Sequence, residues 1–164
     1  MVSVPQLLVR ALQAVVMLIT LALIGNAIDV QHFGNSSVNY CMFAAVFAWI
    51  VIFFGFAASF LESLAKPLIL APMDGLAALF TLIAGIVLAA KLGVHSCGNR
   101  DYINSNSLTQ GSSHRCRELQ AACAFFWFAF VCFVGSLILD FMGCSSTSMR
   151  RSSVRKSGPT MSQV

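Results

Sequence analysis

The chain has 164 residues, of which 58% are hydrophobic and only 10% are charged, and its mean hydropathy is +0.82. This composition excludes a disordered chain and an ordinary soluble domain, whose surface would carry more charge. The net charge of +4 does not indicate nucleic-acid binding, because the basic residues are scattered at the ends of apolar stretches and gather only near the C-terminus.

Four long apolar stretches make up about half of the chain and contain one charged residue, Asp74. At roughly 1.5 Å per residue, helices of these lengths would be roughly 27–35 Å long, close to the roughly 30 Å thickness of a bilayer's hydrocarbon core. The sequence therefore predicts an all-α, polytopic membrane protein with four transmembrane helices. The predicted spans are Ala11–Ile28, Tyr40–Leu61, Leu68–Ala90 and Leu119–Leu139.

The polar segments between the spans are too short to fold a second domain with its own core. We therefore divide the chain into a membrane domain over residues 1–145 and a basic, serine-rich tail over residues 146–164. The first stretch also resembles a signal peptide, with Gly25-Asn26-Ala27 as a small-x-small cleavage site, although its length fits a retained span.

The distribution of Lys and Arg predicts that both termini are cytoplasmic. With this orientation, six basic residues flank the spans on the inside and four on the outside, and the tail contains no acidic residue. The inside residues are Arg10, Lys66, Arg150, Arg151, Arg155 and Lys156, and the outside residues are Lys91, Arg100, Arg115 and Arg117.

Short features between and within the spans give further expectations. Asn35 begins a glycosylation sequon in the first outer loop, but it lies so close to the membrane that we expect it to be unmodified. Pro67 is expected to begin the third helix. Gly55 with Ser59, and Ala71 with Gly75, have the spacing that lets membrane helices approach closely. The six aromatic residues of the fourth span indicate a lipid-facing surface.

The outer loop between the third and fourth spans contains two cysteines, Cys97 and Cys116, each two residues after a histidine. Two cysteines in an oxidising compartment usually pair, and a bond here would close a loop of about 20 residues and stabilise the fold by roughly 3 kcal/mol. A zinc site with His95 and His114 is the alternative, although the spacing within each ligand pair is tighter than usual. The sequence favours the disulfide.

The remaining cysteines lie in or beside the spans. Cys41, Cys123 and Cys132 are interpreted as small buried apolar residues. Cys144 follows the fourth span on the cytoplasmic side, where S-palmitoylation occurs, and is a candidate for that modification.

Asp74 is the only charge inside a predicted span, and an ionisable group there is costly enough to be a candidate functional residue. It is expected to pair with Arg10 or Lys66, or to be protonated. A role in proton or ion movement is the alternative. We find no catalytic constellation, since all three histidines are in outer loops and no phosphate-binding glycine loop is present. The chain is therefore predicted to have no enzymatic activity and no cofactor.

The tail is expected to contact the inner leaflet or a cytoplasmic scaffold. Its four basic residues, Arg150, Arg151, Arg155 and Lys156, would attract anionic lipid at about 1 kcal/mol per charge. Ser152, Ser153 and Ser157 lie among these charges, and phosphorylation there would reverse the attraction. A plain topology signal is the alternative.

Several motifs together resemble a known family. They are Val38-Asn39-Tyr40-Cys41-Met42-Phe43-Ala44, His95-Ser96-Cys97, Tyr102, Ser105-Asn106, Thr109-Gln110-Gly111-Ser112, Arg115-Cys116-Arg117, Gln120-Ala121 and the C-terminal Ser162-Gln163-Val164. With these motifs the chain resembles the fungal non-classical export protein 2 family, a branch of the MARVEL-domain four-span proteins, over nearly its whole length.

The resemblance implies a four-helix MARVEL bundle in the plasma membrane, in the furrow-like domains called eisosomes. It implies that the protein organises those domains, responds to sphingolipid and has a less direct link to export of proteins that lack a signal sequence. The expected partners are sphingolipid or sterol, anionic inner-leaflet lipid, an eisosome scaffold or other membrane proteins, and possible further copies of the chain. A small transporter or channel component that uses Asp74, a membrane-embedded enzyme and a tetraspanin-like adaptor are the alternatives.

Overall fold

The computed structural model describes the backbone of residues 4–60, 67–93 and 95–154, and the side chains of these residues except 67–68 and 143–154. Within these ranges all regular secondary structure is helical. The helices are α1 (Val4–Asp29), α2 (Ser36–Phe60), α3 (Pro67–Leu92), α4 (Arg100–Ser105) and α5 (Ser113–Val154).

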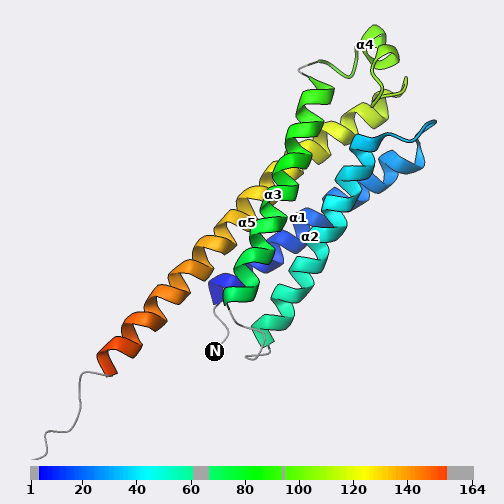
Figure 1. Cartoon of the computed structure of the whole chain (residues 1–164). Coiled ribbons are helices and arrows are strands. Elements are labelled where there is room, and N and C mark those ends of the chain that lie inside the picture. The colour runs from blue at the N-terminus through cyan, green and yellow to red at the C-terminus, as the bar shows by residue number, and fades with distance from the viewer. Residues whose placement is uncertain (1–3, 61–66, 94, 155–164) are drawn as a thin grey trace, which may run out of the picture.

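Four of these helices form an elongated bundle (Figure 1). The most extensive contacts join α5 to α3 and to α1, followed by those of α1 with α2 and of α2 with α3, so the helices follow one another around a ring. Helices α1, α2, α3 and α5 are each long and apolar enough to cross a bilayer. The prediction of a four-span helical protein is thus confirmed.

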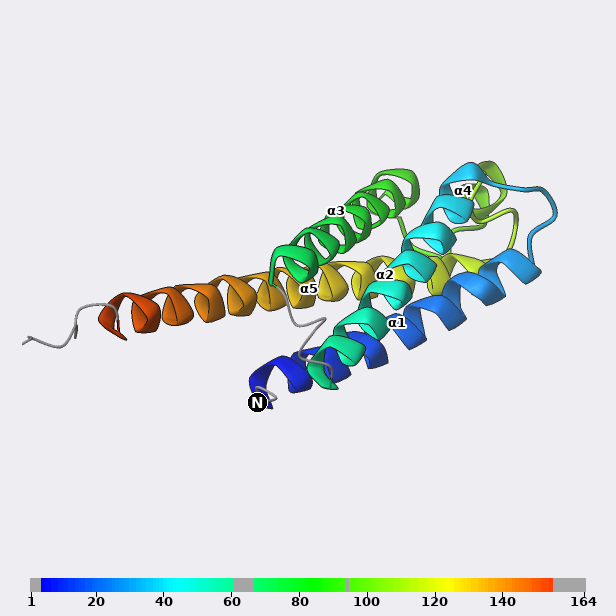
Figure 2. The same ribbon diagram turned by 60° about the horizontal axis from the view of Figure 1, so that its bottom comes forward.

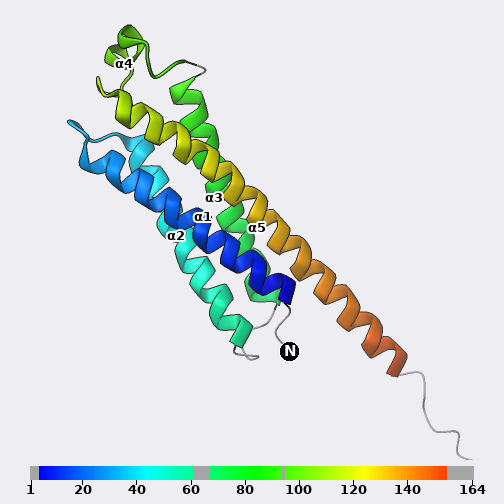
Figure 3. The same ribbon diagram turned by 180° about the vertical axis from the view of Figure 1, so that it is seen from behind.

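The two ends of the bundle differ. At one end, which we call the tail end, α1 begins and α5 continues beyond its neighbours; at the other, which we call the cap end, lies α4 (Figure 2). Figure 3 shows from behind that α1 lies beside α5 along the bundle. Residues 95–112, which contain α4 and connect α3 to α5, are called the cap.

The helices are longer than the apolar stretches that predicted them. Helix α3 begins at Pro67, as predicted, because the missing N–H of proline costs nothing in a first helical turn. Helix α1 begins at Val4, so Arg10 lies inside a span rather than in the flank where the sequence analysis placed it. Helix α5 continues to Val154 without a break, so the predicted tail begins within a helix.

The centre of the bundle combines many small residues with some large apolar ones, and its outside is covered by large apolar residues. Alanines on α2, α3 and α5 are buried, which lets the helices pack closely, as is typical of membrane bundles. Exposed leucine, valine, isoleucine and phenylalanine side chains cover the outward faces, as expected of helices that contact lipid.

Two expectations about packing need correction. The aromatic residues of the fourth span do not all face lipid, because Phe126 and Phe133 are fully buried while Trp127 and Phe128 are exposed. Of the two small-residue pairs, only the one with Gly55 lies at a close contact, since a Cβ added to Gly75 would meet no atom of another residue within 4 Å. One face of each helix packs inward and the opposite face contacts lipid. Composition alone therefore could not tell which aromatic and small residues are buried.

Candidate functional site

A buried polar junction lies in the tail-end half of the bundle, formed by Arg10, Gln13, Asp74 and Ser136. All four side chains are at most 1% exposed. They come from α1, α3 and α5, so one set of contacts connects three of the four spans. Buried charges of this kind persist in membrane proteins only when they are paired and hydrogen-bonded.

The centre of the junction is a bidentate ion pair between α1 and α3. Nη1 of Arg10 donates to Oδ1 of Asp74 at 2.6 Å, and Nη2 donates to Oδ2 at 2.5 Å. The planar guanidinium matches both carboxylate oxygens, which is the strongest geometry available to such a pair. Of the partners expected for Asp74, the structure has Arg10; Lys66 lies outside the described residues.

Three further hydrogen bonds connect this pair to α5 by two routes. Ser136 Oγ donates to Asp74 Oδ2 at 2.6 Å. Arg10 Nη1 also donates to Gln13 Oε1 at 3.0 Å, and Gln13 Nε2 donates to the carbonyl oxygen of Cys132 at 3.1 Å. Each carboxylate oxygen of Asp74 therefore has at least one donor.

Helix α2 contributes Gly55, which has no side chain and so leaves room for Arg10. A Cβ added to Gly55 would overlap the guanidinium of Arg10 and lie 3.0 Å from its Cδ. Glycine at this position therefore provides the space that the arginine occupies, and all four spans take part in the junction.

A second polar contact lies nearer the tail end. Gln6 Nε2 of α1 donates to Oδ1 of Asp140 on α5 at 2.9 Å. Both side chains are half-buried, and Oδ2 of Asp140 is a buried atom without a hydrogen-bond partner in the described part of the chain. The Asp140 carboxylate also interacts electrostatically with that of Asp74.

Toward the cap end, the buried hydroxyls that follow the junction bond within their own helices. Thr20 donates to the carbonyl oxygen of Val16, and Thr81 donates to those of Ala77 and Ala78. These groups are satisfied locally and do not continue the network from Gln13 toward the cap.

Sequence reasoning proposed Arg10 as a partner of Asp74 but missed Ser136 as a second partner and Gln13 as a partner of Arg10. A signal was present, because Gln6, Arg10 and Gln13 have the i, i+4, i+7 spacing that puts residues on one helix face. Ser136 and Asp140 have the i, i+4 spacing on α5. Polar residues that share a face in two apolar stretches predict a contact between those faces.

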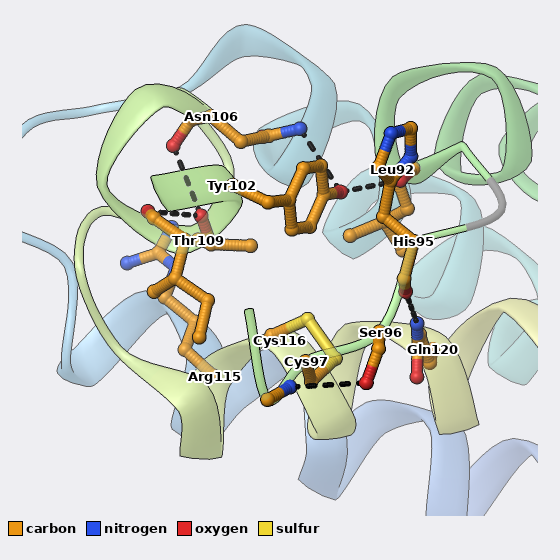
Figure 4. Close-up of a disulfide and its surroundings, with 12 residues drawn as sticks. Leu92, His95, Ser96, Cys97, Tyr102, Asn106, Thr109, Arg115, Cys116 and Gln120 are labelled. Atoms are coloured by element: carbon orange, nitrogen blue, oxygen red, sulfur yellow. Dashed lines mark hydrogen bonds between the residues drawn. A yellow bond between two sulfur atoms is a disulfide. The ribbon is translucent and has the colours of Figure 1, made fainter. Parts of the chain in front are cut away.

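The cap contains a disulfide between Cys97 and Cys116, with 5.7 Å between their Cα atoms (Figure 4). Both cysteines are buried. With both sulfur atoms in this bond, the alternative zinc site lacks its thiolate ligands. His95 instead stacks on Tyr102 with 4.6 Å between ring centroids, and His114 lies beside Glu118.

Side chains of the cap satisfy the carbonyl groups at the end of α3. The hydroxyl of Tyr102 donates to the carbonyl oxygen of Leu92 (Figure 4). Asn106 Nδ2 donates to the carbonyl oxygen of Lys91 at 2.9 Å. Helix ends leave such carbonyls without intrahelical partners, so these bonds hold the cap against the end of the bundle. Gln120 of α5 donates to the carbonyl oxygen of His95 at 3.1 Å.

The cap also contacts the connection between α1 and α2. Gln110 Oε1 accepts from the backbone N–H of His32 at 2.8 Å, and its Nε2 donates to the carbonyl oxygen of Phe33 at 2.9 Å. Asn35 Oδ1 accepts from the N–H of Ser37 at 3.0 Å, at the start of α2. The sequon asparagine therefore has a local structural role.

Arg115 was predicted to lie in an outer loop, but it is in the first turn of α5 and fully buried. Its Nη1 approaches Gln110 Oε1 at 3.5 Å, while Nε and Nη2 have no partner among the described residues. Arg115 was counted among the basic residues of the outer side, because the apolar stretch begins only at Leu119.

The candidate sites in the tail are located only in part. The structure describes the backbone of Cys144, Arg150, Arg151, Ser152 and Ser153 within α5, but not their side chains. Arg155, Lys156 and Ser157 lie outside the described residues. Palmitoylation, phosphorylation and lipid contact at these positions stay predictions.

The fold and the comparisons with known proteins agree on the class: a four-span, membrane-associating helical protein. The family model of the MARVEL membrane-associating domain matches residues 2–139, and the chain belongs to this family. The match covers all four spans and the cap.

Curated relatives place the chain in one branch of that family. It is 38% identical over 166 residues to "Non-classical export protein 2" of Saccharomyces cerevisiae, covering 96% of each chain. It is 40% identical over 174 residues to "Non-classical export protein 2 homolog 1" of the same yeast, covering both chains fully. A Schizosaccharomyces pombe homologue is 34% identical over 134 residues, covering 80% of this chain and 73% of its own. No solved structure matches the chain significantly.

Proposed function

We propose that the protein is a non-enzymatic organiser of lateral domains in the plasma membrane, of the eisosome type and responsive to sphingolipid. The observation that carries the proposal is the distribution of surface in the bundle. Apolar side chains cover the outward faces of the four spans, and the part of the described chain between the spans that meets water is little more than a small cap. Such a molecule interacts mainly through its lateral faces.

In this proposal, three regions of the protein have separate roles. The disulfide-bonded cap keeps α3 and α5 together on the outer side, and the lateral faces contact sphingolipid or sterol. Helix α5 continues past Met142 to Val154, roughly 18 Å at the helical rise, and brings the basic residues to the inner headgroups or to a cytoplasmic scaffold. With both termini cytoplasmic, palmitoylation of Cys144 would strengthen this attachment, and phosphorylation of Ser152, Ser153 or Ser157 would weaken it.

The printed names of the relatives add a link to non-classical export. We propose that this link is indirect. Organisation of the membrane domain comes first, and export of proteins without a signal sequence depends on it. Self-association of the chain would supply the lateral contacts within a domain.

Fluorescence imaging of the tagged protein in living cells tests the proposal. The protein should form plasma-membrane clusters that disperse or reorganise when sphingolipid synthesis is blocked. A chain truncated after Cys144 should insert normally but disperse, and replacement of Arg150, Arg151, Arg155 and Lys156 by glutamine should reproduce this effect. A uniform distribution of the unmodified protein, or clustering of the truncated form, would argue against the proposal.

A small transporter that uses Asp74 is the second candidate, supported by the position of a carboxylate inside the bundle. Its charge is neutralised by Arg10, which favours a structural role. Ion or proton flux into vesicles that contain the purified protein separates the two: the transporter loses its flux in Asp74→Asn while clustering in cells is unchanged. No flux from the unmodified protein would remove this candidate.

A further inference from the structure

Among the side chains that the structure describes, the charges at the tail end of the bundle do not balance. Arg10 carries one positive charge, and Asp74 and Asp140 carry one negative charge each when ionised. Both terminal nitrogens of Arg10 bond Asp74, and Arg10 also attracts the Asp140 carboxylate. One positive charge among the described side chains therefore serves two carboxylates, which leaves one negative charge in excess when both are ionised.

The Asp140 carboxylate has one partner where it has room for more. Gln6 donates to Oδ1, but Oδ2 is buried and has no donor in the described part of the chain. Asp74 lies near enough to repel its charge, and Arg10 attracts it. A buried carboxylate oxygen without a donor costs free energy, and the cost is larger when the group is charged.

The position of Asp140 identifies the kind of partner. It lies near the end of the fourth span, where lipid headgroups begin. The next two side chains, Phe141 and Met142, are 65% and 63% exposed, so apolar surface is exposed at this level of α5. A ligand that suits both features has a cationic hydrogen-bond donor at headgroup depth and an acyl chain alongside.

We propose that Asp140, positioned by Gln6, binds the primary ammonium group of a membrane lipid that enters the bundle between the tail ends of α1 and α5. The ammonium supplies the missing positive charge and donates to Oδ2. A quaternary ammonium has no N–H to donate and does not fit. Phosphatidylethanolamine and long-chain sphingoid bases both carry this group. Only the consequence of this binding rests on the proposed function: the bound lipid would act as a signal at α5, the helix that continues into the tail.

Native mass spectrometry of the purified full-length protein tests this proposal. The protein is reconstituted with phosphatidylcholine alone, with added phosphatidylethanolamine or with added sphinganine, and bound lipids are counted. One ammonium lipid should be retained, and Asp140→Asn should weaken its retention about tenfold, as expected for loss of a charge-assisted hydrogen bond. Asp140→Glu keeps the charge and should retain the lipid. Asp101→Asn, an exposed acid on α4, is the matched control and should change nothing.

The lipid arms separate the two sources of the ammonium, since retention of one additive and not of the other names the source. Formation of the Cys97–Cys116 bond and a single gel-filtration peak show that a variant is folded. Equal retention of phosphatidylcholine and the ammonium lipids would overturn the proposal. In that case the Asp140 carboxylate is neutralised by something other than a lipid. If the stability of the protein changes only with pH, a proton on Asp140 neutralises it; if Lys66→Gln destabilises the protein, the lysine of the chain itself does so. Because binding is measured on purified protein, its failure is distinct from a failure to cluster in cells.

Discussion

The two ends of the bundle are held together in different ways. At the cap end, a disulfide joins the cap to α5, several side chains bond the end of α3, and Gln110 bonds the connection between α1 and α2. At the tail end, the described polar contacts between helices centre on one ion pair, Arg10 with Asp74, and on Gln6 with Asp140. The cap end has many independent connections, and the tail-end half depends on few.

This difference determines how each end responds to change. Connections that act separately leave one another intact when one is removed. The polar junction acts as a unit, because removing one charge leaves its partner buried and unpaired in a low-dielectric environment. The tail-end half is therefore the part of the bundle that a single substitution can open, and it is the part from which α5 continues toward the basic tail.

The largest effect is expected from Asp74→Ala. It leaves the guanidinium of Arg10 buried without a counter-charge, and breaking such a pair typically costs about 3–5 kcal/mol. The free energy of unfolding of the purified protein, from titration with sodium dodecyl sulfate in mixed micelles, measures it. Asp101→Ala, on the exposed surface of α4, is the control and should change stability little. A loss below about 1 kcal/mol for Asp74→Ala would mean that lipid or water compensates Arg10.

The next largest effect is expected from loss of the disulfide at the cap end. Replacement of Cys97 and Cys116 together by serine should lower the free energy of unfolding by about 3 kcal/mol, because the open chain gains loop entropy. The same titration measures this loss, and reaction with a maleimide before and after reduction verifies the bond in the unmodified protein. If the hydrogen bonds of the cap suffice alone, the double variant will match the unmodified protein.

The sequence predicts much of this fold and less of the junction. Four apolar stretches of membrane-spanning length identify the helices, because a bilayer excludes unpaired backbone and leaves few other structures. The pair Cys97 and Cys116 could be proposed because few pairings are possible in one outer loop. Helix ends were placed too far inside, since Arg10 and Arg115 interrupt the apolar pattern but not the helix.

The partners of Asp74 could not be read from composition. The sequence makes both Arg10 and Lys66 candidates, and the packing of α1 against α3 shows that Arg10 pairs with Asp74. The role of Gly55 depends on the same packing, because a glycine in a membrane helix has many explanations until the atom facing it is known. Local patterns predict helices, whereas these contacts depend on which helix faces meet.

A smaller effect in the tail-end half is expected from Gly55→Ala. The added methyl group overlaps the Arg10 side chain, and such overpacking costs about 1–3 kcal/mol. Gly25→Ala is the matched control on α1, because a Cβ there meets nothing within 4 Å and should leave stability unchanged or raise it by up to about 1 kcal/mol. Equal behaviour of the two variants would show that Arg10 moves aside freely.

The smallest effect is expected at the cap end, from Gln110→Ala. It removes the surface hydrogen bonds to the backbone of His32 and Phe33 and also the contact from Nη1 of the buried Arg115. Because that contact is long, at 3.5 Å, the total loss should still be about 1 kcal/mol. Hydrogen exchange of residues 30–35 should speed up, while exchange in α3 and α5 stays slow because the disulfide and the bonds of Tyr102 and Asn106 remain. A loss as large as that of Asp74→Ala would contradict the comparison, because the connections of the cap would then act together, as those of the polar junction do.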